Sequence, residues 1–446
     1  MDVMHSILSG CRNGVPGPVA AAARDEGIPG KDLARAISEG RAVIPANPRR
    51  KHPVLAIGAG CRVKVNVNIG TSGARCDAGL EMEKARAALA NGADTLMDLS
   101  TAGDLAAIRK QILSFRVPVG TVPVYEAVRR AGSALDLGAD LLFRVIREHC
   151  RQGVDFLTLH TGVNLAALDA LKKDPRIMGV VSRGGAFHIA RMDLTGEENP
   201  LFSEFDYLME ILREEEVVAS LGDGMRPGAH HDAGRLAKTT EYLTLGWQAG
   251  RALELGVQRM IEGPGHIPLA QVSQNVREIK ELTGDAPLYL LGPLVTDIAS
   301  GYDHVAAAIG GAVACMDGAD FLCMVSPSEH LALPLVEDIV EGTRICRIAA
   351  HVGDTVRRTG KDWSGRELAM ALARRDLDWE KQFATALYGD VARRIHERDG
   401  DMETCSMCGD LCAVKMVKEI FGEKKGTAGK PAKKETKKRK RTTRPA

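Results

Sequence analysis

Short apolar runs rich in β-branched residues recur along the chain and alternate with longer amphipathic segments. The runs predicted as strands are Arg62–Ile69, Thr95–Leu99, Val117–Val124, Asp155–His160, Met178–Ser182, Val217–Leu221, Gln258–Glu262, Leu288–Leu291 and Phe321–Val325. Most are separated by segments predicted as helices, such as Glu81–Asn91, Phe205–Glu214, Thr240–Leu255 and Val336–His351. This alternation indicates βα units and a parallel sheet. Eight or nine units over about 270 residues predict a (β/α)8 TIM-like barrel, with a doubly wound open sheet as the alternative.

The segments on either side of the barrel pattern differ from it in composition. Residues 1–60 are rich in Ala, Arg, Gly and Pro and predict a small helical extension, which the barrel follows over 61–355. Residues 356–422 predict a helical segment that ends in a cysteine motif, and 423–446 predict a disordered basic tail. Residues 424–446 carry eleven Lys or Arg and one Glu, so the net charge of +1 hides a basic tail on an acidic body. A solvated extension is the preferred interpretation of this tail, and we expect no dedicated nucleic-acid partner.

Targeting signals are missing from the pattern of apolar residues. No apolar run approaches the length of a membrane span, and the N-terminus lacks the apolar core of a signal peptide. We therefore expect a cytoplasmic protein with no membrane partner. In that compartment, ten cysteines favour buried thiols and a metal site over a disulfide framework.

Three cysteines, Cys405, Cys408 and Cys412, lie within eight residues near the C-terminus. Thiolates at this spacing can hold three irons of a [4Fe–4S] cluster and leave the fourth iron open. An open iron can bind the amino and carboxylate groups of S-adenosylmethionine, whose one-electron cleavage gives an adenosyl radical. The alternative is a structural zinc site made of the three cysteines and one further ligand, such as His396.

Polar motifs end most of the predicted strands, and a barrel would bring them together at its carboxyl face, where active sites form. Ser182–Gly185 and Asp223–Gly228 offer main-chain N–H groups and two guanidinium groups, a combination that suits a phosphate and a ribose. Glu262 is a candidate partner for substrate hydroxyl or amino groups. His266 and His330 would form an incomplete divalent-metal site for Zn²⁺ or Fe²⁺. A mononuclear zinc hydrolase with a cysteine zinc knuckle therefore stays open as a second class of enzyme.

Eight motifs carry a family resemblance. They are Asn66–Ser72, Met97–Thr101, Pro118–Tyr125, Val181–Gly185, Ser220–Gly224, Glu262–His266, Leu291–Ile298 and Cys405–Cys408. Together they resemble the phosphomethylpyrimidine synthase (ThiC) family, which includes the 5-hydroxybenzimidazole synthases. The resemblance implies a non-classical radical S-adenosylmethionine enzyme, a carbon–carbon lyase that acts on 5-aminoimidazole ribotide. It also implies a homodimer that receives electrons from an external donor.

The resemblance assigns roles residue by residue. The residues implied to contact the ribotide are Asn68, Met97, Tyr125, His160, Ser182, Arg183, Gly184, Asp223, Gly224, Met225, Arg226, Glu262 and Tyr289. His266 and His330 would hold the divalent metal. Cys405, Cys408 and Cys412 would hold the [4Fe–4S] cluster that works with S-adenosylmethionine.

Four departures from the family pattern lie beside these motifs. Ala102 stands where glycine is expected, Met225 replaces leucine before a segment that also differs, Ser300 replaces proline, and Met324 replaces tyrosine. The residues implied to hold the ribotide persist while their neighbours differ, which favours a shared substrate and a different product. We therefore expect 5-hydroxybenzimidazole, which becomes a cobalamin lower ligand. The alternative product is 4-amino-5-hydroxymethyl-2-methylpyrimidine phosphate, the pyrimidine of thiamine.

Overall fold

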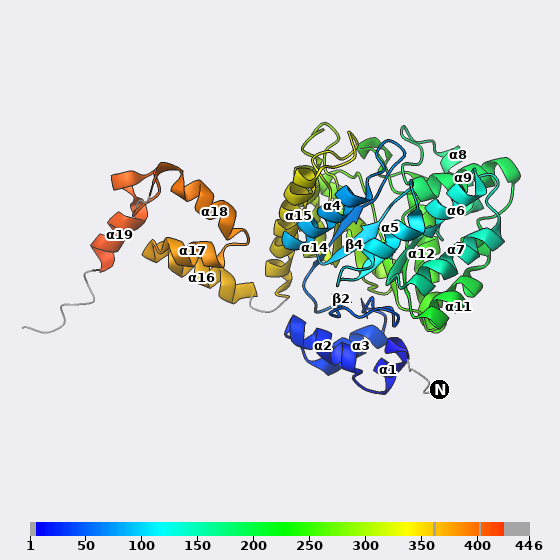
Figure 1. The fold of residues 1–446 in the computed structure, drawn as a ribbon, viewed down its shortest axis with the longest axis horizontal. Coiled ribbons are helices and arrows are strands. Elements are labelled where there is room, and N and C mark those ends of the chain that lie inside the picture. Colours follow the sequence, from blue (N-terminus) through cyan, green and yellow to red (C-terminus); the bar gives the residue numbers. More distant parts are fainter. Residues whose placement is uncertain (1–5, 360–362, 401–402, 423–446) are drawn as a thin grey trace, which may run out of the picture. The chain divides into compact units, whose positions relative to one another are not determined.

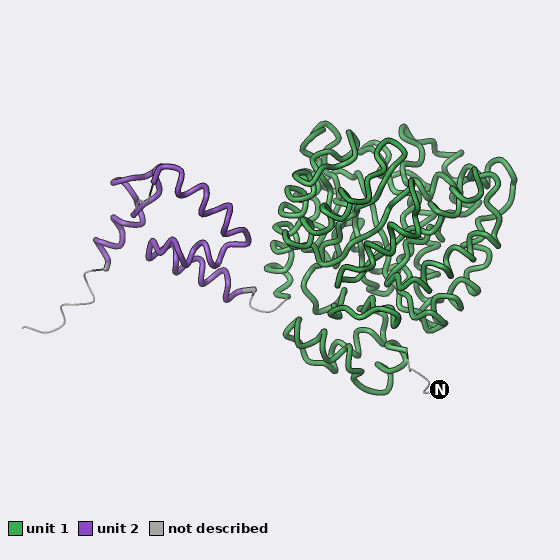
Figure 2. Tube along the Cα trace, in the orientation of Figure 1, with its two compact units in different colours: residues 1–363 green, residues 364–446 purple. Residues whose placement is uncertain are grey.

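The computed structural model describes residues 6–359, 363–400 and 403–422. The basic tail predicted over 423–446 lies outside these residues. The chain forms two compact units, residues 1–363 and residues 364–446, which Figure 2 shows in different colours. Among the helices of the described residues, none combines the length and the apolar character needed to cross a membrane.

Eight parallel strands close into a barrel in the first unit (Figure 1). Neighbouring strands pair in chain order, and the last strand pairs with the first, so the sheet has no open edge. The strands are β3 (Lys64–Ile69), β4 (Thr95–Asp98), β5 (Val119–Thr121), β6 (Phe156–Leu159), β7 (Val218–Leu221), β8 (Arg259–Glu262), β9 (Leu288–Leu291) and β10 (Phe321–Cys323). The predicted (β/α)8 TIM-like barrel is therefore confirmed.

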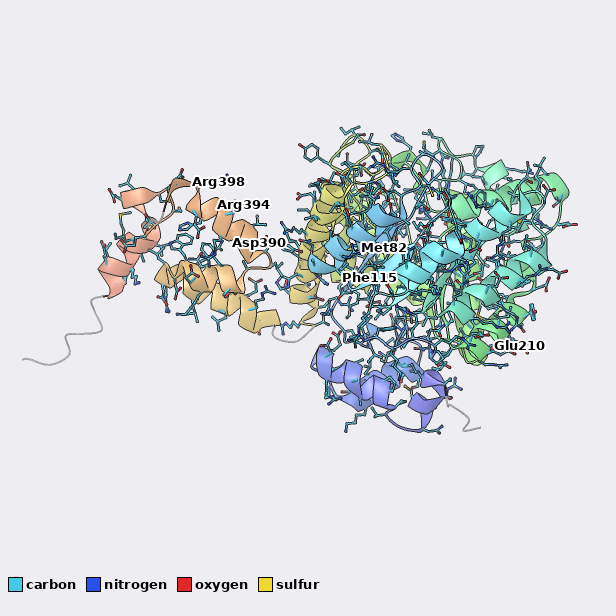
Figure 3. The ribbon with its side chains drawn as sticks, in the orientation of Figure 1. Met82, Phe115, Glu210, Asp390, Arg394 and Arg398 are labelled. Carbon is cyan, nitrogen blue, oxygen red and sulfur yellow. The ribbon has the colours of Figure 1, made fainter. Side chains whose placement is uncertain are left out.

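Helices connect the strands and present one apolar side to the barrel. They are α4 (Ala78–Ala90), α5 (Leu105–Ile112), α6 (Pro123–Ala131), α7 (Ala139–Gln152), α8 (Leu165–Lys173), α9 (Arg183–Thr195), α10 (Pro200–Ser203), α11 (Phe205–Glu215), η1 (His230–Asp232), α12 (Leu236–Glu254), α13 (Leu269–Leu282), α14 (Asp303–Asp317) and α15 (Val336–Arg357). Figure 3 labels Met82 on α4, which is buried in the core, and Glu210 on α11, which is exposed. This division between a buried and an exposed side is what amphipathic periodicity predicts.

Aromatic rings fill the interior of the barrel. Phe156 and Phe321 meet edge to face with their centroids 6.2 Å apart, and Tyr289 stacks on Phe321 at 4.3 Å. Gly120 of β5 makes room for this packing, because a Cβ atom there would lie 2.2 Å from the Phe156 ring. A filled interior is a core rather than a pore, so chemistry must take place at an end of the barrel.

The run Met178–Ser182, predicted as a strand, is irregular in the structure. It leads into α9, and the Ser182 side chain caps that helix by accepting a hydrogen bond from the Gly185 N–H. The Met178 N–H donates to the Asp232 carboxylate at 2.9 Å. The strand prediction is wrong because side chains, rather than a neighbouring strand, satisfy the backbone here. The barrel therefore has eight strands and not nine.

An N-terminal extension packs against the amino ends of the barrel strands. It consists of α1 (Ile7–Asn13), α2 (Gly17–Glu26), α3 (Gly30–Ser38), β1 (Ala42–Val43) and β2 (Ile57–Gly58). Glu26 forms a buried ion pair of 2.8 Å with Lys64, the first residue of β3. The Ile44 N–H donates to Gln258, which precedes β8. These contacts cover the amino end of the barrel and leave the carboxyl end free for a site.

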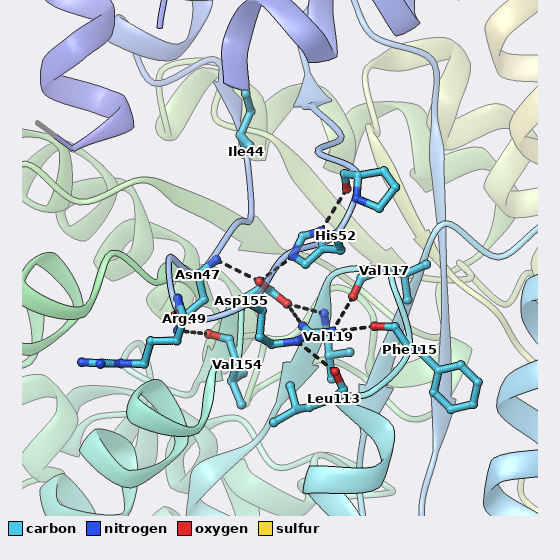
Figure 4. Close-up of polar contacts among 12 residues, drawn as sticks. Ile44, Asn47, Arg49, His52, Leu113, Phe115, Val117, Val119, Val154 and Asp155 are labelled. Atoms are coloured by element: carbon cyan, nitrogen blue, oxygen red, sulfur yellow. Dashed lines mark hydrogen bonds and ion pairs between the residues drawn. The ribbon is translucent and has the colours of Figure 1, made fainter. Parts of the chain in front are cut away.

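Asp155, which precedes β6, ties this extension to the barrel (Figure 4). One carboxylate oxygen accepts from the Asn47 N–H and contacts His52 Nε2, each at 2.9 Å. The other accepts from the Val119 N–H at 2.8 Å and pairs with the Arg50 guanidinium. The Asp155 side chain is fully buried, so none of these interactions is shared with water. This carboxylate therefore joins one strand of the barrel to the segment that follows the extension helices.

We expect Asp155→Ala to lower the free energy of unfolding by about 3 kcal/mol, because it leaves a buried guanidinium without its partner. The measurement is urea unfolding followed by circular dichroism. The matched control is Asp32→Ala, which removes an exposed carboxylate paired with Arg35 and should change stability by less than about 0.5 kcal/mol. A similar small change for Asp155→Ala would mean that water replaces the lost carboxylate.

The second unit is helical. Its elements are α16 (Trp363–Asp376), α17 (Trp379–Thr385), α18 (Gly389–His396), η2 (Glu397–Asp399), η3 (Gly409–Leu411) and α19 (Ala413–Gly422). His396 of α18 stacks on the Trp379 ring of α17 with the centroids 3.8 Å apart and lies 5.7 Å from the Phe383 ring of the same helix, which holds α17 against α18. The predicted segment boundaries at 60, 355 and 422 stay predictions.

Candidate active site

Two neighbouring cavities lie at the carboxyl ends of the barrel strands. The larger has a volume of about 610 Å³ and is lined mainly by the loops that follow the strands, and the smaller, of about 90 Å³, is lined mainly by strand residues. The predicted substrate residues that line them are Asn68, Met97, Tyr125, His160, Arg183, Asp223, Arg226, Glu262 and Tyr289. His266 and His330 line the larger cavity. The fold thus gathers most of the predicted site at one end of the barrel.

Glu262 and Asp223 form a buried pair of acids in the smaller cavity. The Glu262 carboxylate accepts hydrogen bonds from Thr158 at 2.7 Å and Ser220 at 2.6 Å. Arg226 donates to Asp223 at 3.0 Å. Burial, and then the nearby Asp223 charge, raise the pKa of Glu262 to about 8, and burial also raises the pKa of Asp223. The pair therefore holds a proton at neutral pH and can act as an acid.

A candidate phosphate site lies at the start of α9. Arg183 is the first residue of this helix, and its guanidinium lies 5.1 Å from the centroid of the Tyr125 ring. Gly184 packs so closely that a Cβ atom there would lie 2.1 Å from His160. The main-chain N–H groups of a helix N-terminus, together with a guanidinium, can bind an anion such as a phosphate.

Four predicted residues do not line either cavity with their side chains. Ser182 contacts His160 Nε2 at 3.0 Å, and Gly184 packs against the same ring. Gly224 packs against Val163, and the fully buried Met225 lies in a small apolar cluster. Ser182 and Gly184 therefore support the wall of the site, and Gly224 and Met225 lie behind it. Their predicted contact with the ribotide stays a prediction.

Residues from β3, β9 and β10 form a second polar wall. The Asn68 amide donates to Cys323 Sγ at 3.1 Å, and the Asn66 amide donates to the Tyr289 hydroxyl at 2.8 Å. Burial raises the pKa of Cys323 to about 12, so this side chain is a thiol and not a thiolate. Uncharged donors and acceptors line this wall, which suits hydrogen bonding to a neutral heterocycle.

The two predicted metal histidines lie together, with ring centroids 5.0 Å apart. His266 Nδ1 is 2.9 Å from the Asp297 carboxylate, and His330 Nδ1 is 3.5 Å from Asp303. Carboxylates at both Nδ1 atoms leave the Nε2 atoms available, which is the usual arrangement of metal-bound histidines. His330 also has a φ of 61°, a left-handed conformation that is uncommon outside glycine and frequent at functional sites.

The histidines fit a divalent metal as an incomplete ligand set. Burial lowers the pKa of His266, so its ring is neutral and can donate a lone pair. The described residues contain no assembled group of three or more His, Cys, Asp or Glu side chains that could hold a metal ion. Any metal bound by this pair would therefore take its remaining ligands from water or substrate.

The comparison with known families decides what kind of protein this is. The sequence profile of the radical SAM ThiC family matches residues 7–419, nearly the whole chain. The chain belongs to this family. The resemblance drawn from the eight motifs is thus confirmed, and membership opposes the interpretation as a mononuclear zinc hydrolase. Enzymes of the radical SAM ThiC family carry out a radical rearrangement. Membership therefore implies that this chain uses a [4Fe–4S] cluster and S-adenosylmethionine.

The relatives of this ThiC family member match it over almost its full length. Phosphomethylpyrimidine synthase 1 of Methanosarcina mazei is 50% identical over 425 residues, which cover 94% of this chain and 99% of the relative. Phosphomethylpyrimidine synthase of Archaeoglobus fulgidus is 51% identical, with 90% and 96% covered. The enzyme of the same name from Methanopyrus kandleri is 48% identical, with 94% and 100% covered.

In this ThiC family member the three motif cysteines lie around the η3 turn of the second unit. The Cys408 N–H lowers the pKa of the Cys405 thiol, and the two side chains are hydrogen-bonded to each other. Cys412 is buried at the start of α19. Soft thiolate donors beside main-chain N–H groups fit an iron–sulfur cluster. His396, the alternative zinc ligand, stacks on Trp379, and within the described residues neither His396 nor the three cysteines belong to an assembled group of three metal ligands.

Sequence reasoning missed several residues of the ThiC site. Thr158 lies on β6, two positions before His160, and Ser220 lies on β7, so strand alternation could have found both. Asp297 lies inside the motif Leu291–Ile298, but that motif does not mark it as the partner of a histidine, and Asp303 is the first residue of α14, where strand alternation gives no signal. Cys323 was expected to be an ordinary buried thiol, yet it lines the smaller cavity.

Proposed function

We propose that this enzyme converts 5-aminoimidazole ribotide into 4-amino-5-hydroxymethyl-2-methylpyrimidine phosphate in a carbon–carbon lyase reaction. The observation that carries the proposal is that relatives of about half identity, matched over at least 90% of this chain, are named phosphomethylpyrimidine synthases. The departures from the family pattern favoured 5-hydroxybenzimidazole. The relatives favour the pyrimidine, which was the alternative product.

The positions of the four departures support this choice. Ala102 and Met225 are buried and line neither cavity, and Ser300 is exposed on a loop. Of the four, Met324 alone lines a cavity, the larger one. Substitutions that control the product should contact the reacting molecule, and Ala102, Met225 and Ser300 line neither cavity. In the segments that also differ, Ser326 lines the larger cavity, and His230 reaches the site only through Asp297. The departures are therefore weak support for a different product.

The site residues divide the binding of the ribotide between them. Arg183 and the N-terminus of α9 bind the phosphate, where Ser182 caps the helix and His160 supports the wall. Asp223 and Arg226 bind the ribose hydroxyls, and the wall that contains Asn68 binds the aminoimidazole. Binding at three separate places fixes the orientation of a small molecule, which a radical rearrangement needs to reach one product.

Proton transfer in this mechanism belongs to Glu262 and Asp223. Glu262 holds a proton at neutral pH and gives it to a ring nitrogen or a leaving hydroxyl of the ribotide, and the hydrogen bonds from Thr158 and Ser220, with the nearby Arg226 charge, stabilise the carboxylate that remains. Cys405, Cys408 and Cys412 would hold the [4Fe–4S] cluster. When bound, the cluster supplies single electrons to S-adenosylmethionine and so provides the radical that starts the rearrangement.

The proposed function includes a divalent metal, Zn²⁺ or Fe²⁺, at His266 and His330. Support comes from the two imidazoles that face each other and from the carboxylates at their Nδ1 atoms. An ion there would bind a polar group of a substrate or of S-adenosylmethionine at the mouth of the site. His266 and His330 would fix the position of that group.

We expect Asp297→Asn to weaken Zn²⁺ binding by about 10- to 100-fold, because the amide no longer orients and polarises His266. The measurement is competition between the protein and a chelator for Zn²⁺, which does not depend on catalysis. Asp206→Asn, at an exposed carboxylate paired with Arg251, is the matched control and should bind Zn²⁺ like the wild type. Equal affinity in Asp297→Asn would show that the carboxylate does not orient the ligand.

The proposal also includes a homodimer that receives electrons from an external donor. Support for an association between copies is an apolar outer surface on α14 and α15, two helices that pack together. Its exposed residues are Val305, Ile309, Met316, Ile348, Val352 and Val356. Analytical ultracentrifugation would test this, and a monomer at micromolar concentration would contradict it.

The test of the proposed reaction is an anaerobic assay of the reconstituted protein with S-adenosylmethionine, 5-aminoimidazole ribotide and a reductant. Mass spectrometry identifies the product. The mass of the hydroxymethylpyrimidine phosphate supports the proposal. The mass of a hydroxybenzimidazole would overturn it and show that the departures near the site do set the product.

A further inference from the structure

Two hydroxyl groups hold one oxygen of the acid at the centre of the site. Thr158 of β6 and Ser220 of β7 both donate to Glu262 Oε1, at 2.7 Å and 2.6 Å. Glu262 is the last residue of β8, so three adjacent strands of the barrel meet at this oxygen. All three side chains are buried. Two donors on a single oxygen leave the other carboxylate oxygen to face the rest of the site.

The second oxygen of Glu262, Oε2, lies beside Gly222, the residue that precedes Asp223. Asp223 is hydrogen-bonded to Glu262 and also accepts a hydrogen bond from Arg226. A Cβ atom at position 222 would lie in tight contact with Glu262 Oε2, at 3.3 Å, so the glycine leaves room for this oxygen. Two buried carboxyl groups this close cannot both ionise without a large cost, so they share a proton. Because Oε1 already accepts two hydrogen bonds, that proton belongs on Oε2.

We propose that Thr158 and Ser220 are positioning residues that hold Glu262 Oε1, so that Oε2 carries the proton shared with Asp223 and offers it to the substrate. The inference concerns the chain's own proton donor, and it rests on the proposed function for the identity of the molecule that receives the proton. Neither hydroxyl needs to contact that molecule. Their effect is exerted through the orientation and the acidity of Glu262.

The direction of the effect follows from the hydrogen bonds. Each hydroxyl donates to Glu262 and therefore stabilises its ionised form, which keeps the pKa lower than burial alone would set it. Removing one hydroxyl should raise that pKa further, by about one pH unit. The titratable groups that face Glu262 from the surrounding elements are Asp223, Arg226, Tyr125, His160, Tyr289 and Cys323. Of these, Asp223 and Arg226 carry the charges that matter near neutral pH.

The experiment measures the protonation of Glu262 directly by infrared spectroscopy of the full-length holoenzyme without substrate. The carbonyl band of a protonated carboxylic acid is followed as a function of pH, and Glu262→Gln identifies which band belongs to Glu262. Thr158→Val and Ser220→Ala each remove one donor. The matched control is Thr343→Val, which removes a buried hydroxyl that donates only to the Ile339 carbonyl within α15.

We expect a wild-type midpoint near 8, a midpoint about one pH unit higher in Thr158→Val and Ser220→Ala, and no change in Thr343→Val. The alkaline limb of the pH–rate profile should move by the same amount. Unchanged midpoints in both variants would overturn the proposal, as would the absence of a Glu262 band near neutral pH. If the midpoints move but no pyrimidine is formed by the wild type, the proposed reaction fails and the assignment of the hydroxyls stands.

Discussion

Replacing Cys408 with serine should abolish formation of the pyrimidine phosphate and remove the [4Fe–4S] cluster. A serine hydroxyl stays protonated at neutral pH and is a hard donor, so it cannot replace a thiolate as an iron ligand. With two cysteines left in the motif, the cluster loses one of its three protein ligands. The measurements are iron and sulfide content per chain, visible absorbance after anaerobic reconstitution, and product formation over a long incubation.

The control for this variant is Cys76→Ser. Cys76 is exposed like Cys408 but lies in the barrel unit, outside the motif. It should keep the full iron content and the wild-type rate. A Cys408→Ser protein that retained both the cluster and turnover would contradict the assignment of the motif. A cluster retained without turnover would show that Cys408 acts in orientation rather than in holding the iron.

The barrel could be predicted from the sequence because its signal repeats. Eight of the nine predicted runs are strands, and each was recognisable from β-branched residues between helical segments. The run Met178–Ser182 has the same composition, but Ser182 caps a helix and Asp232 binds the Met178 backbone. That difference depends on a carboxylate about fifty residues away, so local composition could not reveal it.

Residues of the candidate site could be predicted from the sequence only where they lie at the ends of strands. Glu262 is the last residue of β8 and His266 lies in the loop that follows, and a parallel barrel places all such positions at one end. Asp297 became a partner of His266 only through the fold, because it belongs to the loop after the next strand. The product was harder to predict than the site residues. A residue beside a motif, such as Met225, can lie behind the wall of the cavity, where it does not line the site.

Arg226→Ala should lower kcat/KM for the ribotide by about 10³-fold. The guanidinium lines both cavities and donates to Asp223 at 3.0 Å. Its loss removes a donor to the substrate and leaves Asp223 without its cation beside Glu262. Arg226→Lys keeps the charge but not the planar fork, so it should lose activity by an intermediate factor of about 10- to 100-fold. Arg235→Ala, which breaks a more exposed pair with Asp174, should stay within about 2-fold of the wild type.

A second substitution separates the two causes of the Arg226 effect. If the loss comes from the unpaired Asp223 charge, adding Asp223→Asn to Arg226→Ala removes that charge and should restore part of the affinity for the ribotide. If Arg226 binds the substrate itself, the double variant stays at least as weak as the single one, because Asp223 also binds the ribose hydroxyls. Isothermal titration with the ribotide distinguishes these outcomes without turnover. We expect the second outcome, because the guanidinium faces both cavities while Asp223 already shares a proton with Glu262.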